Sequence, residues 1–432
     1  MRLPYNRDEL ATGIVHLGVG AFHRAHQAVY TEQVVRRFGG DWGICGVSLR
    51  RPDVRDALAA NDNLYTVAIK STDTVELQAI GVLRELLVAP ENPTLVIERI
   101  AATGTKVVTL TITEKGYCLN PATGALDPEH TDIVHDLSHP DQPRSAIGFL
   151  VAGLAARRGD GSGGLTILSC DNLSNNGGKL RNATLEFASS IDSDLCEWID
   201  QYCCFPSSMV DRIVPAITDT HIDAAAQQLG FRDEALVVTE PFRQWVVENN
   251  FAGPVPAWDE VGAEFVKDVE PFELMKLRLL NASHSTLAYL GCLAGYESVA
   301  DVMGDTAFVS LVEQLMEEMA CTLPDLDGFD VDGYRRQLLQ RFANRGLEHQ
   351  TRQIAMDGSQ KIPQRLLPAI AERLSRGEAP DASILGLAAW IRYTMGVDEE
   401  GLRWEVSDPL AETFSSLMQS TAAEPDAYLE AV

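Results

Sequence analysis

The sequence predicts an α/β fold, with a Rossmann-type N-terminal domain followed by a mainly α-helical C-terminal domain. In the first half, short apolar runs of strand length alternate with helical stretches, as in a parallel sheet whose two faces are covered by helices. After about Val269 strand candidates nearly vanish and long amphipathic helices follow. We therefore place a boundary near residue 270, with a dinucleotide-binding type of α/β domain over residues 1–270 and a helical domain over residues 271–432.

The strands expected in the N-terminal domain are short runs rich in valine, isoleucine and leucine. In chain order they read GIVHLGVG (13–20), WGICGVSL (42–49), KVVTLTIT (106–113), GLTILSC (164–170) and ALVVTEP (235–241). Helices are predicted after the first strand, up to Gly39 and Gly40, and at SAIGFLVAGLAARR (145–158). The segment TVELQAIGVLREL (74–86) alternates only weakly, so we expect an extended insertion there. The clearest helices of the C-terminal domain cover residues 308–319, 332–343 and 384–395.

Composition and charge argue against polyanionic partners. The formal net charge of −27 disfavours nucleic acid and anionic membrane surfaces, because both are polyanions. No apolar run approaches the roughly 20 residues that cross a bilayer, and the start MRLPYNRDELATG lacks the apolar core of a signal peptide. We therefore expect a cytoplasmic protein, either monomeric or dimeric.

The cysteines and histidines predict neither a disulfide framework nor a metal site. The eight cysteines are scattered and form no C-x-x-C pair, so we expect reduced, mostly buried thiols. The nine histidines include His23 and His26, but no dense ligand cluster accompanies them. We therefore expect no structural or catalytic metal.

A glycine turn in HLGVGAFHRAH predicts a nucleotide site. Gly18 and Gly20 stand where the first strand meets a helix, which is where a backbone approaches a pyrophosphate and offers helix N-terminal amides. His23 occupies the place of the third glycine of the usual fingerprint. We expect Gly18, Gly20, Phe22 and His23 to bind the cofactor, although two glycines alone also fit a simple tight connection.

The end of the second predicted strand, SLRRPD, bears on the choice of cofactor. Asp53 could accept hydrogen bonds from the 2′-hydroxyl of NAD, whereas Arg50 and Arg51 could pair with the 2′-phosphate of NADP. We expect NAD, with Asp53 as its ribose ligand, and NADP is not excluded. A solvated loop at the start of a helix is the alternative.

In the segment PFELMKLRLLNASHSTLAYLG, four polar residues interrupt an apolar helix. On a helical wheel Glu273, Lys276, Asn281 and His284 share one arc of roughly 140°, interleaved with leucines. Burying a single lysine costs several kcal/mol unless it is compensated or its pKa falls. The segment therefore predicts either a catalytic face or a buried Glu273–Lys276 pair beside a core histidine.

A second polar cluster lies in TRQIAMDGSQKIPQR. Gly358 allows a tight turn there, and Arg352 and Lys361 could reach hydroxyl groups or a carboxylate of a substrate. A solvated loop between helices is an equally good interpretation of this cluster.

Six segments together resemble the long-chain mannitol dehydrogenase family, over about residues 5 to 400. They are GVGAFHRAHQAVYTE, SCDNLSNNG, MVDRIVPA, VVTEPFRQWV, FELMKLRLLNASHS and MDGSQKIPQRL. The most specific element is K-x-x-x-x-N-x-x-H, present as Lys276, Asn281 and His284. The resemblance implies a zinc-independent enzyme with a nicotinamide cofactor in a Rossmann-type domain. It also implies that the mainly helical C-terminal domain, residues 271–432, is the substrate-binding domain.

The resemblance also implies roles for individual residues. Lys276 would be the general base, Asn172 and Asn281 would hold the reacting oxygen, and His284 would bind a substrate hydroxyl. Glu273 would lie beside the lysine on a proton path, and Asp211 would face the site. These residue types suit alcohol oxidation without a metal, because a desolvated lysine can take the proton and neutral amides can stabilise an oxyanion.

The predicted function is hydride transfer between NAD(H) and a polyol/ketose pair, of the mannitol 2-dehydrogenase type. A hexuronate reductase of the same family, acting on fructuronate or tagaturonate, is the first alternative. The other alternative is a non-catalytic nucleotide-binding protein, which the intact set Lys276, Asn172, Asn281 and His284 disfavours. The expected partners are therefore small polyols, ketoses or hexuronates.

Overall fold

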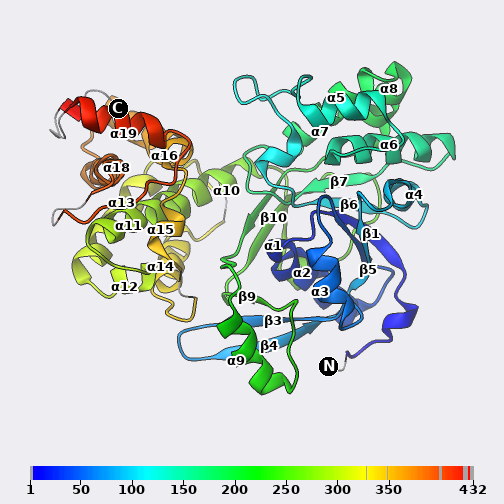
Figure 1. Cartoon of the computed structure of the whole chain (residues 1–432), viewed down its shortest axis with the longest axis horizontal. Helices are drawn as coiled ribbons and strands as arrows, with labels where there is room; N and C mark the ends of the chain where they lie inside the picture. Colours follow the sequence, from blue (N-terminus) through cyan, green and yellow to red (C-terminus); the bar gives the residue numbers. More distant parts are fainter. Residues whose placement is uncertain (1–2, 327, 348, 398–400, 422–426, 429–432) are drawn as a thin grey trace. The chain divides into compact units, whose positions relative to one another are not determined.

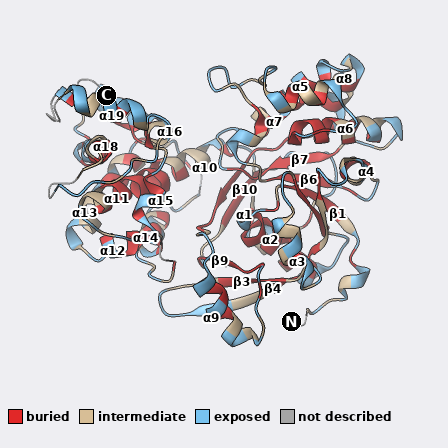
Figure 2. Ribbon diagram, in the orientation of Figure 1, coloured by how far each residue is buried: buried red, intermediate tan, exposed pale blue. Residues whose placement is uncertain are grey.

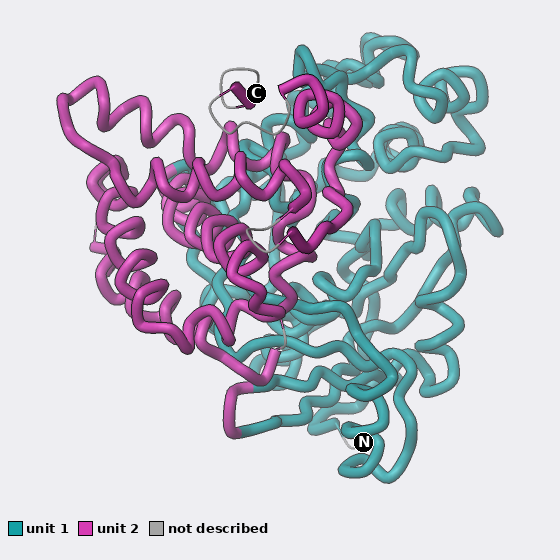
Figure 3. The backbone as a smooth tube through the Cα atoms, turned by 60° about the vertical axis from the view of Figure 1, so that its left-hand side comes forward, with its two compact units in different colours: residues 1–70, 74–270 teal, residues 71–73, 271–432 magenta. Residues whose placement is uncertain are grey.

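The computed structural model describes residues 3–326, 328–347, 349–397, 401–421 and 427–428. These residues form two compact units (Figures 1 and 3). The first, here called the N-unit, comprises residues 1–70 and 74–270, and the second, the C-unit, comprises residues 71–73 and 271–432. The chain therefore passes between the units three times. No helix among the described residues is both long enough and apolar enough to cross a bilayer.

The centre of the N-unit is a five-stranded sheet with all neighbours parallel, in the order β5-β2-β1-β6-β7. Its strands are β1 (Thr12–Leu17), β2 (Gly43–Ser48), β5 (Leu83–Val88), β6 (Val107–Leu110) and β7 (Thr166–Ser169). Four of them lie in the apolar runs predicted as strands, which confirms the Rossmann-type fold. The prediction of an insertion at residues 74–86 is wrong, because β5 is an edge strand of this sheet. Its weak alternation reflects the partial exposure of its middle residues.

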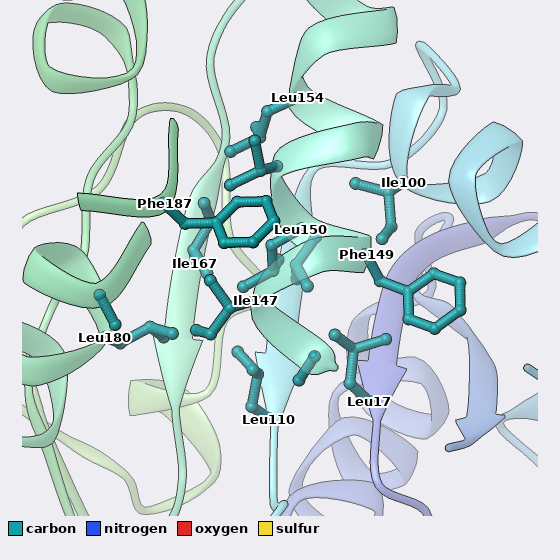
Figure 4. Close-up of a cluster of buried hydrophobic side chains, with 14 of the residues drawn as sticks. Leu17, Ile100, Leu110, Ile147, Phe149, Leu150, Leu154, Ile167, Leu180 and Phe187 are labelled. Atoms are coloured by element: carbon teal, nitrogen blue, oxygen red, sulfur yellow. The ribbon is translucent and has the colours of Figure 1, made fainter. Parts of the chain in front are cut away.

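Both faces of this sheet are buried, and neighbouring residues alternate between two hydrophobic clusters. Val15, Val108 and Ile167 point to one cluster, while Ile14 and Leu168 point to the other. Figure 4 shows the first cluster, where Leu150 and Phe187 from covering helices meet Leu110 and Ile167 from the sheet. Burial on both faces explains why these strands are continuously apolar.

The helices of the N-unit surround the sheet and connect its strands. They are α1 (Ala21–Ala25), α2 (Gln27–Phe38), α3 (Asp53–Ala59), α4 (Pro93–Ala101), α5 (Thr131–Ser138), α6 (Ala146–Gly159), α7 (Asn176–Ser189), α8 (Ser193–Tyr202) and α9 (Asp219–Leu229), with short 3₁₀ turns η1 (Arg7–Glu9), η2 (Glu114–Tyr117) and η3 (Asp259–Val261). The predicted helix at residues 145–158 is α6, and the side chain of Ser145 caps it by accepting from the amide of Gly148.

Two small sheets complete the N-unit. One has the order β4-β3-β9 and the other β11-β10-β8. Their strands are β3 (Tyr65–Lys70), β4 (Val75–Ile80), β8 (Ser208–Asp211), β9 (Val237–Thr239), β10 (Gln244–Glu248) and β11 (Glu264–Val266). The predicted strand at 235–241 is β9, but it pairs with β3 rather than with the five-stranded sheet.

Among the described residues of the C-unit, the regular elements are helices, as predicted. Its elements are α10 (Glu270–Met275), the π-helical turn η4 (Lys276–Asn281), α11 (Ala282–Leu293), α12 (Val299–Val302), α13 (Thr306–Ala320), α14 (Val331–Phe342), α15 (Thr351–Ile354), α16 (Gly358–Arg365), α17 (Leu367–Ser375), α18 (Asp381–Thr394) and α19 (Ala411–Ser420). The helices predicted at 308–319, 332–343 and 384–395 correspond to α13, α14 and α18.

Helix α11 is the core of the C-unit. It packs against α12, α13, α15 and α18, and Figure 2 shows it buried along most of its length. Its close approach to α18 depends on Gly386, since a Cβ there would lie 2.5 Å from the hydroxyl oxygen of Thr286. A helix enclosed in this way holds its side chains in fixed positions.

Candidate active site

The glycine turn lies at the topological switch point of the parallel sheet. From β1 the chain goes to β2 and β5 on one side, and it then crosses to β6 and β7 on the other. In open parallel sheets, ligands bind outside the carboxyl ends of the strands at such a point. Gly18 and Gly20 directly follow the carboxyl end of β1, so the fold places them where a dinucleotide binds.

Gly18 is held tightly between the ends of two neighbouring strands. Its φ is +94°, and a Cβ at this position would lie 2.1 Å from the carbonyl oxygen of Thr111. Its amide donates to the carbonyl of Val47 at 2.9 Å. Gly20 is exposed, and a Cβ there would come no closer than 3.9 Å to its neighbours. The turn therefore combines a fixed backbone with an open face at Gly20, which fits a pyrophosphate.

His23, at the place of the usual third glycine, is fully buried. Its ring stacks on His16 with 3.4 Å between centroids. The helix after the turn is interrupted at His26, since α1 ends at Ala25 and α2 starts at Gln27. The side chain of His23 thus fills the space under the turn, while Phe22 beside it is partly exposed. Only the backbone of His23 is left to face a cofactor.

His16 and His26 complete a group of buried neutral imidazoles beneath the turn. The Nδ1 atom of His16 lies 2.7 Å from Thr109 Oγ1, and its Nε2 lies 2.9 Å from Thr111 Oγ1. The Nε2 atom of His26 lies 2.8 Å from the carbonyl oxygen of Gln244. Burial lowers the pKa of His16 and of His26 to about 3 each. Both rings are therefore uncharged at neutral pH.

Asp53 is the first residue of α3, just beyond the carboxyl end of β2. Its side chain is 65% exposed and lies 3.3 Å from Arg51. Arg50 pairs with Asp132 at 2.6 Å. Both arginines thus have carboxylate partners, although ion pairs this exposed are weak and yield readily. Asp53 is available to a ligand at the strand end where a ribose is bound in this fold.

Asp171 joins the ends of β6 and β7. It was not among the predicted site residues. Its buried carboxylate accepts hydrogen bonds from the amides of Ile112 and Thr113 at 3.0 and 2.8 Å, and from the Tyr117 hydroxyl at 2.7 Å. Burial raises the pKa of Asp171, and these hydrogen bonds oppose that shift. The next residue, Asn172, is exposed at the carboxyl edge of the sheet. Asp171 thus fixes the backbone that presents Asn172.

Asp211 is the last residue of β8 and is buried, with 3% of its surface exposed.

Asn176 connects strand β8 to the end of β7 by hydrogen bonds. Its Nδ2 donates to the carbonyls of Asp171 and Ser208 at 2.9 and 2.7 Å, and its Oδ1 accepts from the amide of Ser208. Asn176 lies in the segment SCDNLSNNG, but nothing in its residue type distinguished it from its neighbours.

The segment that carries Lys276 differs from the predicted α-helix. Residues Lys276–Asn281 form a π-turn, in which the amide of Ala282 donates to the carbonyl of Leu277 five residues earlier. On an α-helix Lys276 and Asn281 would lie about 140° apart, whereas the wider i→i+5 turn reduces this angle to about 50°. Lys276 and Asn281 therefore share one face, and His284 follows within about 60° of it. All three are largely buried, with 8%, 8% and 9% exposed.

His284 lies between two rings of the C-unit. Phe342 stacks on it with 5.4 Å between centroids, and the ring of His349 lies at 4.6 Å. The buried Nε2 atom of His284 has no hydrogen-bond partner among the described residues. Burial lowers its pKa far below the usual range, and its positive neighbours lower it further. A neutral imidazole with a free nitrogen can bind a hydroxyl group.

The groups whose charge lowers the pKa of His284 come from two helices, α14 and α16, and from the segment before α15. They are His349, Arg365, Arg341 and Lys361. Lys361, on α16, donates to the carbonyls of Met356 and Ile354 at 2.5 and 3.3 Å. Arg352, on α15, is exposed. His349 and Arg365 were not recognised in the sequence, because neither lies within the spacing of the Lys276 segment.

The remaining predictions for the site concern Glu273 and metal ligands. Glu273 lies on α10, one turn before Lys276, and is partly buried. Over the described ranges, no three histidine, cysteine, aspartate or glutamate side chains converge in a way that could hold a metal ion. The eight cysteines are free, and only Cys321 is exposed.

Comparisons with known proteins place the chain in one family. Residues 12–260 match the mannitol dehydrogenase Rossmann domain, and residues 268–432 match the mannitol dehydrogenase C-terminal domain. D-mannonate oxidoreductase of Escherichia coli is 46% identical over 96% of this chain and 87% of its own length. A mannitol 2-dehydrogenase of Pyricularia oryzae is 42% identical over 99% of this chain and 88% of its own.

A solved structure agrees with this assignment. Pseudomonas fluorescens mannitol 2-dehydrogenase, in a ternary complex with NAD and D-mannitol, is 38% identical and has a TM-score of 0.88. The match covers 100% of this chain and 92% of that one. Since the family domains account for nearly the whole sequence, the chain belongs to the mannitol dehydrogenase family.

Proposed function

We propose that the chain is a zinc-independent, NAD-dependent oxidoreductase that interconverts a polyol and its ketose, as mannitol 2-dehydrogenases do with mannitol and fructose. The observation that carries this proposal is the π-turn, which gives Lys276 and Asn281 a common face with His284 close by. Its cofactor assignment is supported by the Pseudomonas relative, whose structure contains NAD.

In the N-unit, the residues assigned to the cofactor lie along the carboxyl edge of the parallel sheet. Gly18 and Gly20 would receive the pyrophosphate, since neither residue has a side chain that would block the close approach of a phosphate to the start of α1. Asp53 would accept hydrogen bonds from the ribose hydroxyls, which favours NAD over NADP. Phe22 would contact the cofactor with its exposed ring edge, and His23 would contribute its backbone alone.

In the C-unit, Lys276 is assigned the role of general base. NAD would supply the acceptor for the hydride of the alcohol carbon, and Lys276 would take the hydroxyl proton. Burial suits this role because it favours the neutral amine. Asn281 would donate a hydrogen bond to the oxygen as negative charge develops on it. Glu273, one turn earlier on the helix, would pass the proton to solvent.

Further side chains would bind the rest of the substrate. His284 has an unsatisfied ring nitrogen that can bind a hydroxyl. Asn172 would be the second amide on the reacting oxygen, and Asp211, Arg352 and Lys361 would contact the remaining hydroxyl groups. These assignments follow the pattern of the family and the exposure of Asn172 and Arg352.

A hexuronate reductase is the second candidate, and a specific observation favours it. After burial, the groups that lower the pKa of His284 are His349 and the cations Arg365, Arg341 and Lys361. His349 itself is uncharged at neutral pH, because burial lowers its pKa to about 4. A carboxylate at one end of the substrate would be attracted to such a group of cations. The 46% identity to a D-mannonate oxidoreductase agrees with this alternative.

A spectrophotometric screen tests both candidates. The absorbance of the reduced cofactor is followed with mannitol, arabinitol, fructose, fructuronate and tagaturonate, each with NAD(H) and with NADP(H). We expect the highest kcat/KM for a polyol/ketose pair with NAD(H). A preference of at least tenfold for fructuronate or tagaturonate would establish the second candidate. NADH binding without turnover of any pair would reject both and support a non-catalytic role.

A further inference from the structure

We infer that Arg365 is a positioning residue, which holds the π-turn so that Lys276 and Asn281 keep a common face. The inference rests on the proposed roles of Lys276 and Asn281. Arg365 is the last residue of α16, 84 positions after Asn281, and it reaches back to the start of α11.

One nitrogen of Arg365 contacts the junction between the π-turn and α11. Its Nη1 donates to the Ser285 hydroxyl oxygen at 2.7 Å and to the carbonyl oxygen of Asn281 at 3.4 Å. Asn281 is the last residue of the π-turn, and Ser285, four residues later, is fully buried. The guanidinium therefore clamps the backbone of the residue whose side chain is assigned to the reacting oxygen.

The π-turn needs such support, because it is an uncommon conformation. Isolated π-turns inside α-helices are rare and tend to occur at functional sites. Relaxing to an α-helix would increase the angle between Lys276 and Asn281 to about 140° and separate the two side chains. Arg278, within the turn, is fixed from another direction, since it donates to the carbonyl of Thr322 and pairs with Glu372 at 3.1 Å.

The charge of Arg365 has a separate effect on the site. Among the described residues Arg365 has no ion pair with a carboxylate, and burial lowers its pKa to about 10. It stays protonated at neutral pH and, with His349, Arg341 and Lys361, lowers the pKa of His284. Removing the charge should make His284 easier to protonate. The acidic limb of the pH profile of kcat therefore shows the effect of the charge separately from the effect of the hydrogen bonds.

The test compares three variants in the full-length protein. Arg365→Met removes both the clamp and the charge, Arg365→Lys keeps the charge, and Ser285→Ala removes one acceptor. We expect Arg365→Met to lower kcat by about 10², the scale of a 1 Å misplacement of reacting groups, with a smaller change in KM and an unchanged Kd for NADH. Arg365→Lys should recover part of kcat, and the acidic limb of its pH profile should match that of the wild type.

Ser285→Ala keeps the inference testable if Arg365→Met folds poorly. It should lower kcat several-fold, and it should cost little more in the Arg365→Met background, because both changes break the same contact. The control is Arg373→Met on α17, which removes an arginine that donates to the carbonyl of Glu318 at 3.2 Å and pairs with Glu378 at 3.2 Å.

Three results would overturn the inference. They are equal losses of kcat in Arg365→Met and Arg373→Met, full additivity of Ser285→Ala with Arg365→Met, and an Arg365→Met enzyme that keeps a third of its turnover. Lys276→Ala, assayed alongside, separates these from a failure of the proposed function. If Lys276→Ala stays active, the assignment of the base is wrong, whatever the Arg365 variants do. If it is inactive while Arg365→Met is not, only the inference fails.

Discussion

Acidification should destabilise the N-unit through its buried histidines. His16 and His26 have their pKa lowered to about 3 by burial, so they stay neutral in the folded protein at pH 5.5. In the unfolded chain the same groups titrate near pH 6.5. Their stabilising effect is therefore complete above pH 6.5 and is lost progressively as the pH falls from 6.5 toward 3.

The magnitude follows from the linkage between protonation and folding. Between pH 7.5 and 5.5 each of these histidines should reduce the free energy of unfolding by about 1.4 kcal/mol. For His16 and His26 together the loss is about 3 kcal/mol, and His23, whose pKa is also lowered well below its usual range, adds to it. Ordinary carboxylates remain ionised over this interval and contribute little. Asp171, with its raised pKa, acts in the opposite direction at lower pH.

Urea unfolding at the two pH values measures this loss, with the fluorescence of Trp245 and Trp258 as the probe, since both are buried in the N-unit. The matched variant is His16→Asn, which keeps a polar group near Thr109 but cannot be protonated. It should lose about 1.4 kcal/mol less than the wild type on acidification. A wild-type loss below about 1 kcal/mol, or the same loss in the variant, would refute the reasoning.

Four further predictions concern the site. Lys276→Ala should still fold and bind NADH, while turnover falls by about 10² to 10⁴ and the pH profile of alcohol oxidation loses one ionisation. A variant that keeps a tenth of the activity and the same pH profile would show that this lysine has a structural role. Gly18→Ala should weaken NADH binding at least tenfold, because the new Cβ meets a strand carbonyl at 2.1 Å. Gly39→Ala is its control, since φ there is also positive, at +69°, but no atom lies within 4 Å of the new Cβ; equal losses of NADH affinity would contradict the steric explanation. NADH should be preferred over NADPH, and a tenfold preference for NADPH, abolished by replacing Arg50 and Arg51 with alanine, would reverse the assignment of the ribose site. Prolonged chelation should leave activity intact, and an activity restored only by Zn²⁺ would show that a metal is required.

The fold was largely predictable because burial on both sides leaves a strong signal in the sequence. β1, β6 and β7 lie between two clusters and read as unbroken apolar runs. β5 was missed because an edge strand with partly exposed residues resembles an insertion. The pairing of β9 with β3 was also missed, since an apolar run does not encode which sheet it joins.

The site was only partly predictable, since several of its contacts depend on chain folding. The residue types Lys276, Asn281 and His284 could be identified in the sequence, but α- and π-turns have the same apolar pattern, so their common face could not. Asp171 and Arg365 act through contacts with residues 54 to 84 positions away. Contacts between residues so far apart in the chain cannot be predicted from the local spacing of residue types.

Residues 71–73 belong to the C-unit, although the chain on both sides of them belongs to the N-unit. This affects where the chain can be cut into fragments. These residues form the tip of the hairpin between β3 and β4, yet they belong with residues 271–432. The carbonyl oxygen of Ser71 packs so closely on Gly346 that a Cβ there would lie 2.4 Å away. A fragment expressed from Pro271 onward would lack this piece of its own unit. A division of the chain at the single bond 270–271 therefore separates residues 71–73 from the unit with which they pack.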